Sequence, residues 1–502
     1  MIYYPEKIKI LAFSKPFFFQ PPHFNIFIQM AQENIDANVE ALLAKMTLSE
    51  KIGQMNQYNG FWEETGPQAG GGNKKMKYEH LRKGLVGSML NVRGTSDVRK
   101  IQETAVNETR LGIPLIFGYD VIHGHKTLSP IPLAEAASWD LEAIEKSARI
   151  AAIEASAVGI NWTFAPMVDI SRDARWGRVM EGGGEDTYLS TKIGVARIKG
   201  FQGDDLSATD TIAATAKHFA AYGFSEAGRD YNTVDIGTST LYNVVFPPFK
   251  AAVEADVKTF MNSFNIVNGV PATGNRFLQR EILKGEWNFE GFVVSDWASG
   301  LEMIEHGFAE DAKHVAELAA NAGSDMDMES YAFVSHLEAL VNEGKVEMNV
   351  IDDAVRRILR VKFELGLFDD PYRYCNAERE KELIYHPDHH AAVLDMAKKS
   401  IVLLKNENGL LPFQKNRQKI AVIGALAADK TSPLGSWRIG SDDDTAVSVL
   451  EGLDKYTKNY SFAKGAELSI GKVDFREEIT VNETDKSGFA EAVQLAKESE
   501  LV

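Results

Sequence analysis

The sequence predicts an α/β protein that consists of a TIM-like barrel followed by the start of a second, open α/β sandwich domain. Three observations lead to this prediction. The chain has 502 residues, which is too long for one ordinary domain. From about Asn38, short apolar runs alternate with amphipathic helical segments, as in parallel βα units whose sheet is covered on both faces. A separate strand-and-turn pattern begins after residue 397.

The barrel is predicted to span residues 38–372. Its first element is a helix at 39–55, and apolar runs that end in polar residues are predicted to be its strands. These runs lie at 84–91, 114–120, 161–169, 212–219, 257–265, 292–297 and 324–328. Helical segments lie between them, for example at 97–110 and 141–159, and a last helix is expected at 351–366. About seven units in roughly 330 residues favour a barrel over a doubly wound sheet.

Residues 373–396 are predicted to be a linker and residues 397–502 an incomplete C-terminal α/β sandwich domain. The segment QKIAVIGALAAD at 418–429 is typical of a strand followed by a Gly-Ala turn. Its single Gly424 is a weak dinucleotide-binding signal, so an ordinary strand-to-loop turn is the favoured interpretation. The last residues, 489–502, are predicted to be a helix and the first two residues of a strand. We therefore expect the second domain to be truncated.

The first 37 residues are interpreted as an N-terminal arm that is not native to the fold. Its aromatic stretch is interrupted by Lys15, Pro16 and a Pro-Pro pair, so it has neither the apolar core of a secretory signal nor a membrane span. Either this arm is a loose segment or translation begins at Met30, and the second interpretation is favoured. Localisation stays open on these grounds.

The composition favours a soluble enzyme or binding protein for a small ligand. Hydrophobic residues make up 44% of the chain, and 71 acidic against 54 basic residues give a formal charge of −17. An acidic chain without a long basic run is a poor candidate for binding nucleic acid or an anionic membrane, whereas it suits a neutral or cationic substrate. Cys375 is the only cysteine, so an intrachain disulfide is excluded.

Polar side chains gather at the C-terminal ends of several predicted strands, where a barrel places its active site. They are Asp120, Asp169, Lys217, His218 and Asp296. Each has an ordinary explanation, because a strand-end Asp is more often a helix cap and a Lys-His pair is more often structural. Together they are harder to dismiss, since burying charges is costly unless they pair with one another or with a ligand.

The segment RDARWGRVMEGGGED at 172–186 favours a polyhydroxylated ligand. Its arginines and acids can bind hydroxyl groups, and Trp176 can stack on a sugar face. A phosphate cradle at glycines 182–184 is disfavoured because no Lys-Ser/Thr follows them. His123 and His125 lack metal-ligand spacing, and no Gly-x-Ser-x-Gly elbow is present. We expect no metal, no cofactor, and no serine or cysteine nucleophile.

The residues resemble glycoside hydrolase family 3, in particular its bacterial periplasmic β-glucosidase type. The stretches that carry the resemblance run in the family's order from about residue 38 to the end of the chain. They are GYDVIHGHKT, PIPLAEAASWD, NWTFAPMVDISRDARWGRVMEGGGEDTYL, KHFAAYGFSEAGRDYNTVD, FPPFKAAVEA, NIVNGVPATGN, GFVVSDW and SIVLLKNENGLLPF. The resemblance implies a retaining, exo-acting β-glucosidase that acts on β-glucosides or cello-oligosaccharides, and a periplasmic location.

The resemblance also implies a role for individual residues. Asp296 matches the nucleophile of the family's Ser-Asp-Trp motif, which forms a covalent glycosyl-enzyme. Arg178, Lys217 and His218 match positions around the sugar in the −1 subsite. Asp120 matches the acid that binds hydroxyls on the far side of that sugar.

Two tryptophans complete the implied site. Trp297 and Trp437 resemble the aromatic pair that flanks the +1 sugar, although inter-domain packing is an equal alternative for Trp437. Phe264 stands where some relatives carry a Tyr near the nucleophile, and Ser129 replaces a Phe that is common before Pro-Ile.

The acid/base residue is the main departure from the family pattern. The loop after Lys-His-Phe lacks the Asp-x-His dyad of the family's N-acetylglucosaminidases and phosphorylases. In the β-glucosidase branch the acid/base is a Glu of the second domain, which we expect to lie beyond Val502. Retention requires two carboxylates about 5–5.5 Å apart. The glutamates of the barrel loops are instead expected to order arginines and backbone amides; these are Glu181, Glu185 and Glu226.

Alternatives to a working β-glucosidase follow from this departure. The chain could be a catalytically impaired fragment that binds sugar without turning it over, or its specificity could be that of a β-xylosidase. Nothing in the residues separates glucose from xylose selectivity, and association into homodimers is left open.

Overall fold

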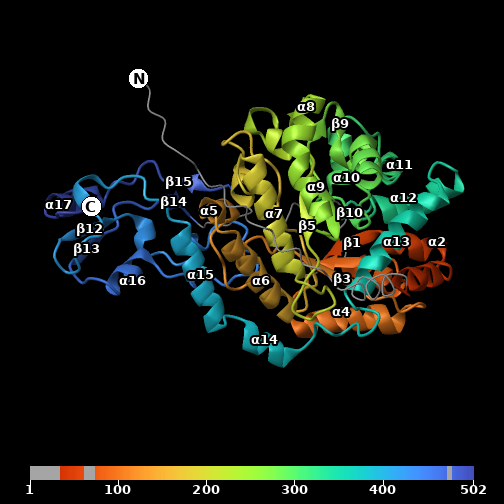
Figure 1. The fold of residues 1–502 in the computed structure, drawn as a ribbon, viewed down its shortest axis with the longest axis horizontal. Helices are drawn as coiled ribbons and strands as arrows, with labels where there is room; N and C mark the ends of the chain where they lie inside the picture. Colours follow the sequence, from red (N-terminus) through yellow and green to blue (C-terminus); the bar gives the residue numbers. More distant parts are fainter. Residues whose placement is uncertain (1–33, 61–73, 472–477) are drawn as a thin grey trace, which may run out of the picture.

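The computed structural model describes residues 34–60, 74–471 and 478–502 (Figure 1). The N-terminal arm predicted for 1–37 lies outside these ranges except for its last four residues. In Figure 1 the barrel occupies the centre and right of the view, and the C-terminal region, coloured blue, lies at the left. No helix in the described ranges is long and apolar enough to cross a bilayer.

The predicted TIM-like barrel is confirmed as a ring of parallel strands within the described residues. In ring order, the strands are β1 (Asn56–Asn59), β2 (Ser88–Leu90), β3 (Ile116–Tyr119), β4 (Trp162–Thr163), β5 (Thr215–Phe219), β7 (Thr259–Asn262), β10 (Phe292–Val294) and β11 (Asp327–Met328). Single bridges complete the ring where ladders are short, with Trp162 opposite Ala213 and Val294 opposite Met326. The last strand returns to the first, because Asn56 of β1 pairs with Asp327 of β11.

The strand β1 was not among the predicted runs. Instead of one helix at 39–55, residues 34–43 are helical and a second helix, α2 (Leu48–Gln54), begins at a capping box. In this box the Thr47 hydroxyl accepts from the Glu50 amide, and the Glu50 carboxylate accepts from the Thr47 amide at 2.9 Å. The strand reads NQYN, so it lacks the apolar signature of its neighbours. Its polar side chains are buried and their amide nitrogens are bonded, with Asn56 Nδ2 donating to the Leu85 carbonyl and Gln57 Nε2 to Ser88 Oγ, both at 2.8 Å.

Helices surround the ring and cover its apolar outer face. They are α3 (Lys74–Arg82), α4 (Thr95–Glu108), α5 (Pro132–Ala137), α6 (Leu141–Ala157), α7 (Thr187–Gln202), α8 (Thr238–Thr240), α9 (Phe246–Glu254), α10 (Ser299–Glu305), α11 (Ala312–Ala322), α12 (Ala332–Asn342) and α13 (Met348–Glu364). The helices predicted at 97–110, 141–159 and 351–366 correspond to α4, α6 and α13 within three residues at each end. Between β7 and β10 the covering element is a π-helical segment, η6 (Phe277–Glu286).

The loops of the ring carry short elements of their own. Strands β6 (Thr233–Val234), β8 (Ile266–Val267) and β9 (Val270–Pro271) form a small sheet beside the barrel. Short helical turns include η1 (Gly177–Glu181), η2 (Tyr222–Phe224), η3 (Glu226–Gly228), η4 (Leu241–Val245) and η5 (Ala272–Gly274). Of these, η1 lies in the loop that follows β4 and supplies an arginine to the site described below.

The stretch 373–396, expected to be a linker, contains α14 (Ala377–Leu383) and most of α15 (Pro387–Lys399). Both helices pack against α6 (Figure 1). Glu154 of α6 is fully buried and accepts from His389 Nδ1 at 3.0 Å and from the Tyr385 amide at 3.2 Å. This segment is therefore fixed to the barrel by a buried carboxylate.

The C-terminal region is a small α/β arrangement. Strands β12 (Ile420–Ile423) and β13 (Tyr460–Ala463) pair in parallel, and Leu501 forms a further parallel bridge to Ile420 of β12. Strand β14 (Ser469–Ile470) pairs with β15 (Thr480–Val481). Helices α16 (Val449–Asp454) and α17 (Phe489–Lys497) complete it, with short turns η7 (Glu407–Gly409), η8 (Ala425–Ala428) and η9 (Ser432–Leu434). The strand predicted at 418–429 and the final helix are both present.

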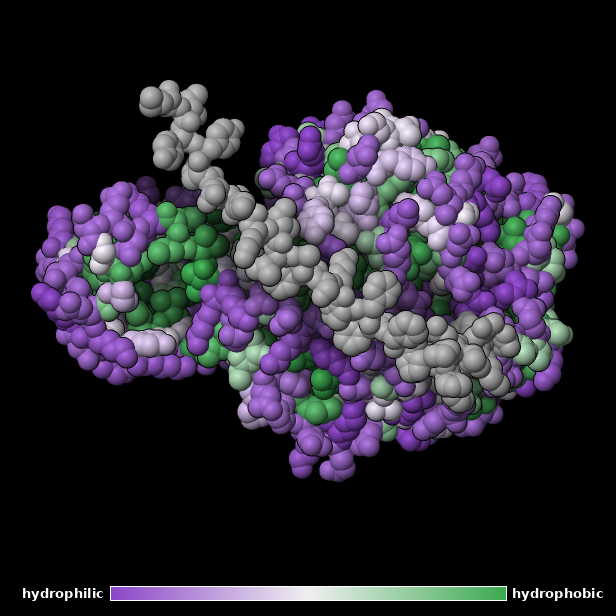
Figure 2. Space-filling model, in the orientation of Figure 1, coloured by the Kyte–Doolittle hydropathy of each residue, from purple (hydrophilic) through white to green (hydrophobic). Residues whose placement is uncertain are grey.

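Many large apolar side chains stay exposed in this region. Leu404 is 91% exposed and Ile401 78% exposed. Figure 2 shows apolar surface lining a hollow in the lobe at the left of the view. The C-terminal region therefore buries its apolar residues less completely than the barrel, whose core holds fully buried aromatic rings such as Trp162 and Phe117.

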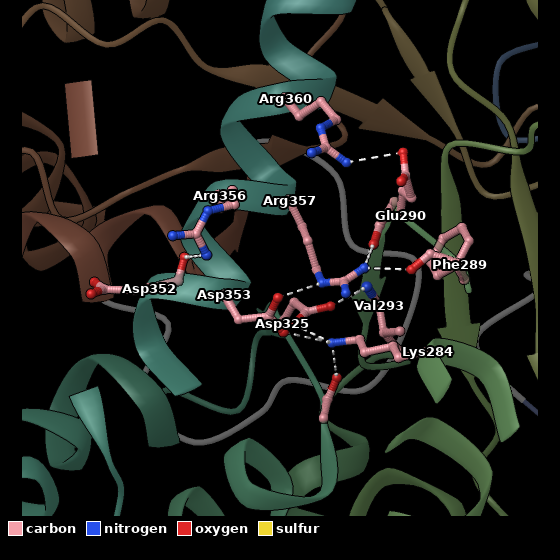
Figure 3. A network of polar contacts seen from close by, with 12 residues as sticks. Lys284, Phe289, Glu290, Val293, Asp325, Asp352, Asp353, Arg356, Arg357 and Arg360 are labelled. Carbon is pink, nitrogen blue, oxygen red and sulfur yellow. Dashed lines mark hydrogen bonds and ion pairs between the residues drawn. The ribbon is translucent and has the colours of Figure 1, made fainter. Parts of the chain in front are cut away.

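A network of buried charges joins the barrel strands to α13 at the N-terminal ends of β10 and β11 (Figure 3). Lys284 Nζ lies 2.6 Å from Asp325 Oδ1, and the other Asp325 oxygen accepts from the Val293 amide at 2.8 Å. Arg357 of α13 donates to the carbonyl of Phe289 at 2.6 Å and pairs with Asp353 at 3.0 Å. Burial lowers the pKa of Lys284 to about 8, and Asp325 opposes that shift. In a TIM barrel this end of the strands is the end that serves stability.

We expect Asp325→Asn to lower the free energy of unfolding by about 3 kcal/mol, because the buried Lys284 ammonium loses its nearest carboxylate and keeps only Asp353, at 4.0 Å. Denaturant unfolding followed by circular dichroism measures the change. Glu290→Gln is the matched control, since Glu290 pairs with Arg360 at 3.2 Å but its side chain is 75% exposed. The control should lose less than about 1 kcal/mol. Equal losses in both variants would contradict a structural role for the buried pair.

Candidate functional site

The predicted site residues meet at the C-terminal ends of the barrel strands. Asp120 directly follows β3, Lys217 and His218 lie in β5, and Asp296 comes two residues after β10. All four residues are at least nine-tenths buried. Because β3, β5 and β10 are parallel strands of one ring, their C-terminal ends bring these side chains to one face, as the sequence predicted.

Asp296 has one carboxylate oxygen fixed and one unoccupied. Its Oδ1 accepts from the Trp297 amide at 2.6 Å. Its Oδ2 is buried, and no donor among the described residues bonds to it; His218 Nε2 is 3.6 Å away. Burial raises the pKa of Asp296 to about 6, while Arg178 and Lys217 act in the opposite direction. The carboxylate is thus held in place and charged at neutral pH, with a free oxygen.

His218 is held in one tautomer by its two neighbours. Arg178 Nη2 lies 2.7 Å from His218 Nε2, and a guanidinium can only donate, so Nε2 must be the acceptor. The ring therefore carries its proton on Nδ1 and donates it to Asp169 Oδ2 at 2.8 Å. Burial, with the positive charges of Arg178 and Lys217, holds the pKa of His218 well below its usual value. His218 is neutral and bridges a cation and an acid.

Asp169 anchors that arrangement. Its Oδ2 also accepts from the His218 backbone amide at 2.7 Å. Burial raises the pKa of Asp169 to about 7, and the His218 amide lowers it. Asp169 was predicted among the strand-end residues. In the structure it acts through His218, which it orients with two hydrogen bonds, and it makes no hydrogen bond to Asp296.

Arg178 comes from η1 and is oriented by Glu181 of the same turn. Its Nε lies 2.6 Å from Glu181 Oε1 and its Nη2 3.0 Å from Glu181 Oε2. The expectation that Glu181 orders Arg178 is therefore confirmed. The same oxygen, Oε1, accepts from Trp437 Nε1 at 2.7 Å. Trp437 belongs to the C-terminal region, so the site is built from both parts of the chain.

Lys217 and Asp120 form the other side of the site. Lys217 Nζ is 3.5 Å from Asp120 Oδ1 and 5.5 Å from the centre of the Trp437 ring. Burial raises the pKa of Asp120, and Lys217 opposes the shift. Trp437 thus faces two cations, because Arg178 Cζ lies 5.8 Å from the same ring.

Trp176 and Trp297, the two other tryptophans that the sequence assigned to the site, are placed differently from Trp437. Trp176 was expected to stack on a sugar, but it is 1% exposed and its Nε1 donates to Asp230 at 2.9 Å. That expectation is wrong, because Trp176 packs edge-on against Tyr222 inside the barrel core. Trp297 is 8% exposed and also belongs to a core cluster, so its role as a sugar-facing wall stays a prediction.

Three residues near Asp296 were not identified from the sequence. Tyr222 lies edge-on to His218 at 5.3 Å, and Tyr231 packs on Phe264 at 4.5 Å between ring centres. Phe264, which stands where some relatives carry a Tyr, therefore packs against the rings of both Tyr222 and Tyr231. Burial, with Asp296 next in effect, raises the pKa of Glu302 to about 8. Glu302 follows the Asp-Trp motif by five residues, one helical turn into α10, which is the only sequence signal it carries.

The site suits a neutral polyhydroxylated molecule better than a metal ion. Carboxylates, a guanidinium, an ammonium and a neutral imidazole converge on it, and each can bond a hydroxyl group. Across the described ranges, no group of three or more His, Cys, Asp or Glu side chains could hold a metal ion. The set also contains one carboxylate oxygen, Asp296 Oδ2, that no donor among the described residues bonds.

Comparison with known proteins points to the same chemistry. The model of the glycosyl hydrolase family 3 N-terminal domain matches residues 47–361, and that of its C-terminal domain matches residues 401–502. A periplasmic beta-glucosidase of Salmonella typhimurium is 38% identical over 486 residues, covering 94% of this chain and 62% of the relative. A beta-xylosidase of Formosa agariphila is 33% identical over 493 residues, covering 94% and 61%.

A solved structure is similar as well. The beta-glucosidase of Listeria innocua in complex with isofagomine has a TM-score of 0.83 and 38% identity, covering 91% of this chain and 62% of that one. The chain thus spans a little over three fifths of the length of each of these three proteins.

We expect Asp296→Asn to be more stable than the wild type at pH 8. The folded pKa of Asp296, about 6, lies above its ordinary value of 3.8, so its stabilising contribution is complete below about pH 4 and is lost as the pH rises through 6. A two-unit shift corresponds to at most about 3 kcal/mol, and about 1–3 kcal/mol is expected. Asparagine carries no charge, so the stability of Asp296→Asn does not fall with the ionisation of this side chain.

Thermal melts from pH 4 to pH 8 measure the difference. The advantage of Asp296→Asn should shrink toward zero at pH 4. Asp443→Asn serves as the control, because the Asp443 side chain is 71% exposed and pairs with Arg438 on the surface. It should give no gain at pH 8. A pH-independent gain for Asp296→Asn would contradict the charge as its cause.

Proposed function

The chain belongs to glycosyl hydrolase family 3, and from that premise we propose that it forms the sugar-binding and nucleophilic part of a retaining, exo-acting β-glucosidase site. The observation that carries the proposal is the buried carboxylate of Asp296, with one oxygen fixed by a backbone amide and the other unoccupied. In the proposed step, Oδ2 attacks the anomeric carbon, the glycosidic bond breaks, and the leaving group departs with the bonding electrons. The product is a glycosyl-Asp296 enzyme.

The side chains around Asp296 are proposed to bind the glucosyl unit in the −1 subsite. Arg178, Lys217 and Asp120 present charged hydrogen-bonding groups to one space, and such groups bind hydroxyls strongly. The resemblance implies that His218 contacts the sugar. Because both of its ring nitrogens are already bonded, we assign it in addition the orientation of Arg178. The two cations also favour the ionised form of the nucleophile.

The aromatic wall of the site is proposed to be Trp437, with Trp297 beside the nucleophile. We assign Trp437 both of the roles that the sequence left open. Its ring faces Lys217 and Arg178, which supports the sugar-flanking role, and its indole N–H bonds to the barrel, which supports the packing role. An indole ring is a suitable surface for the apolar face of a sugar. Trp297 is supported only by its position next to Asp296.

The substrates we propose are β-glucosides or cello-oligosaccharides. Specificity for β-xylosides is the second candidate, because relatives named as beta-xylosidases are 33–34% identical to this chain. The third outcome, sugar binding without turnover, would place the chain among sugar-binding proteins. Trapping and binding measurements distinguish all three.

We expect 2,4-dinitrophenyl 2-deoxy-2-fluoro-β-glucoside to label Asp296. This leaving group departs without protonation, so the step tests the nucleophile independently of any acid, whose loss typically costs about 10²–10⁴-fold. Intact-mass spectrometry should show one fluoroglucosyl group per chain, and peptide mapping should place it on Asp296. The analogous fluoroxyloside should label more slowly if glucose is preferred.

Two variants control the labelling. Asp296→Asn should remain unlabelled, and Asp443→Asn should be labelled like the wild type. A label on another residue would refute the assignment of the nucleophile. Absence of any label, combined with calorimetric binding of an imino sugar that resembles glucose, would identify a sugar-binding protein.

The rate of labelling should rise with pH through about 6 and level off by pH 8, because only the ionised Asp296 attacks and its pKa is about 6. Below that value the rate should fall about tenfold for each pH unit. Stopped-time mass spectrometry between pH 4.5 and pH 8 measures the profile. A rate that is flat between pH 5 and pH 7 would contradict the raised pKa of this carboxyl group.

A further inference from the structure

We propose that Glu181 is a positioning residue that makes the geometry of the sugar site depend on the docked position of the C-terminal region. This inference rests on the proposed function for the identity of the ligand, but its structural part stands on contacts alone. Glu181 has a fully buried side chain and touches one residue of the C-terminal region and two of the barrel site.

The carboxylate of Glu181 is shared between the two parts of the chain. Its Oε1 accepts from Arg178 Nε at 2.6 Å and from Trp437 Nε1 at 2.7 Å. Its Oε2 accepts from Arg178 Nη2 at 3.0 Å and lies 4.0 Å from Lys217 Nζ. One oxygen therefore holds both the indole and the guanidinium, and moving either changes the geometry of the other.

The loop that carries Trp437 is attached to the barrel on both sides of the indole. Before it, the Ser436 carbonyl lies 2.7 Å from His123 Nε2. After it, Arg93 donates to the Ile439 carbonyl at 3.3 Å, and Lys126 pairs with Asp442 at 2.6 Å. Trp437 itself adopts a left-handed backbone conformation with φ of 55°, which is unfavourable for a large side chain. The attachments and the bond to Glu181 hold the residue in this conformation.

The contact to Glu181 continues to the nucleophile through two further residues. Arg178, which Glu181 fixes at two nitrogens, donates to His218 at 2.7 Å. The same ring nitrogen of His218 lies 3.6 Å from Asp296 Oδ2. Displacement of Trp437 would free one bond of Glu181 and allow Arg178 to turn. That movement would alter a proposed hydroxyl-binding group and the cation that acts most strongly on the Asp296 carboxylate.

A packing role and a positioning role for this contact make different predictions. If Trp437 only fills space, a phenylalanine should substitute for it, because the apolar ring remains. If the indole N–H positions Glu181, Trp437→Phe should weaken binding by about tenfold or more, as expected for loss of a buried hydrogen bond to a charged group. Glu181→Gln should have a similar effect through Arg178.

The test uses the full chain with Trp437→Phe, Glu181→Gln and the double variant. Calorimetric titration with a glucose-like imino sugar and the rate of labelling by the fluoroglucoside are the readouts. We expect each single variant to lose about tenfold or more, and the double variant to lose less than the product of the two, since both remove one shared contact. Trp139→Phe, at a tryptophan that is 75% exposed, should change neither quantity.

Two results would overturn the proposal. One is a folded Trp437→Phe protein that binds the imino sugar and reacts within twofold of wild type. The other is a double variant whose loss equals the product of the single losses, because the two residues would then act separately. Should Glu181→Gln fail to fold, Trp437→Phe, which changes no charge, decides the question alone.

A spectroscopic readout separates this inference from the proposed function. In ¹⁵N-tryptophan-labelled protein, the indole N–H resonance that disappears in Trp437→Phe should shift in Glu181→Gln, while the Trp139 resonance stays in place. If the wild type binds no imino sugar but the Trp437 resonance shifts in Glu181→Gln, the contact between Glu181 and Trp437 is upheld and the proposed function fails. An unshifted resonance overturns the contact whatever the sugar does.

Discussion

The constraint on which this structure depends is that charges taken out of water need partners. At the C-terminal end of the barrel, carboxylates and cations are buried together, and each remains ionised only where an opposite charge or a donor is close. Glu181 meets this requirement completely, with Arg178, Lys217 and an indole N–H around it. Asp296 meets it in part, since one oxygen has no donor among the described residues. Glu181, with both oxygens bonded, is therefore suited to hold the site in place, whereas Asp296 keeps an oxygen that is free to react.

The two ends of the barrel use similar groups for different purposes. At the N-terminal ends of β10 and β11, both oxygens of Asp325 are bonded, and the neighbouring Arg357 donates to backbone carbonyls (Figure 3). At the opposite end, single oxygens of Asp169 and Asp296 and the Tyr222 hydroxyl are buried without a bonded partner in the described structure. Unsatisfied buried polar atoms are costly, and these three lie around the site where the sugar is proposed to bind.

Sequence reasoning found the strands whose apolar residues precede a charged one, because burial on both faces leaves a continuous hydrophobic run. It missed β1, whose Asn and Gln side chains are buried but bonded to neighbours, since a polar strand looks like a loop until those partners are known. It placed Asp120, Lys217, His218 and Asp296 on one face, because parallel strands end on the same side. It misjudged Trp176, as the residue type alone cannot tell a buried ring from one that meets a ligand. The bond between Glu181 and Trp437 spans 256 positions, and no local pattern predicts such a contact.

The neutral state of His218 has a consequence for the charge that the site can accept. With the imidazole uncharged, the positive charges among the site residues described are Arg178 and Lys217, against the carboxyl groups of Asp120, Asp169, Glu181 and Asp296. Burial raises the pKa values of three of these acids, Asp120, Asp169 and Asp296, so the pocket stabilises their negative charges less well than water does. Such a pocket draws in positive charge of any origin, whether a proton, a basic nitrogen, or the charge that develops on a carbon as a bond to it breaks.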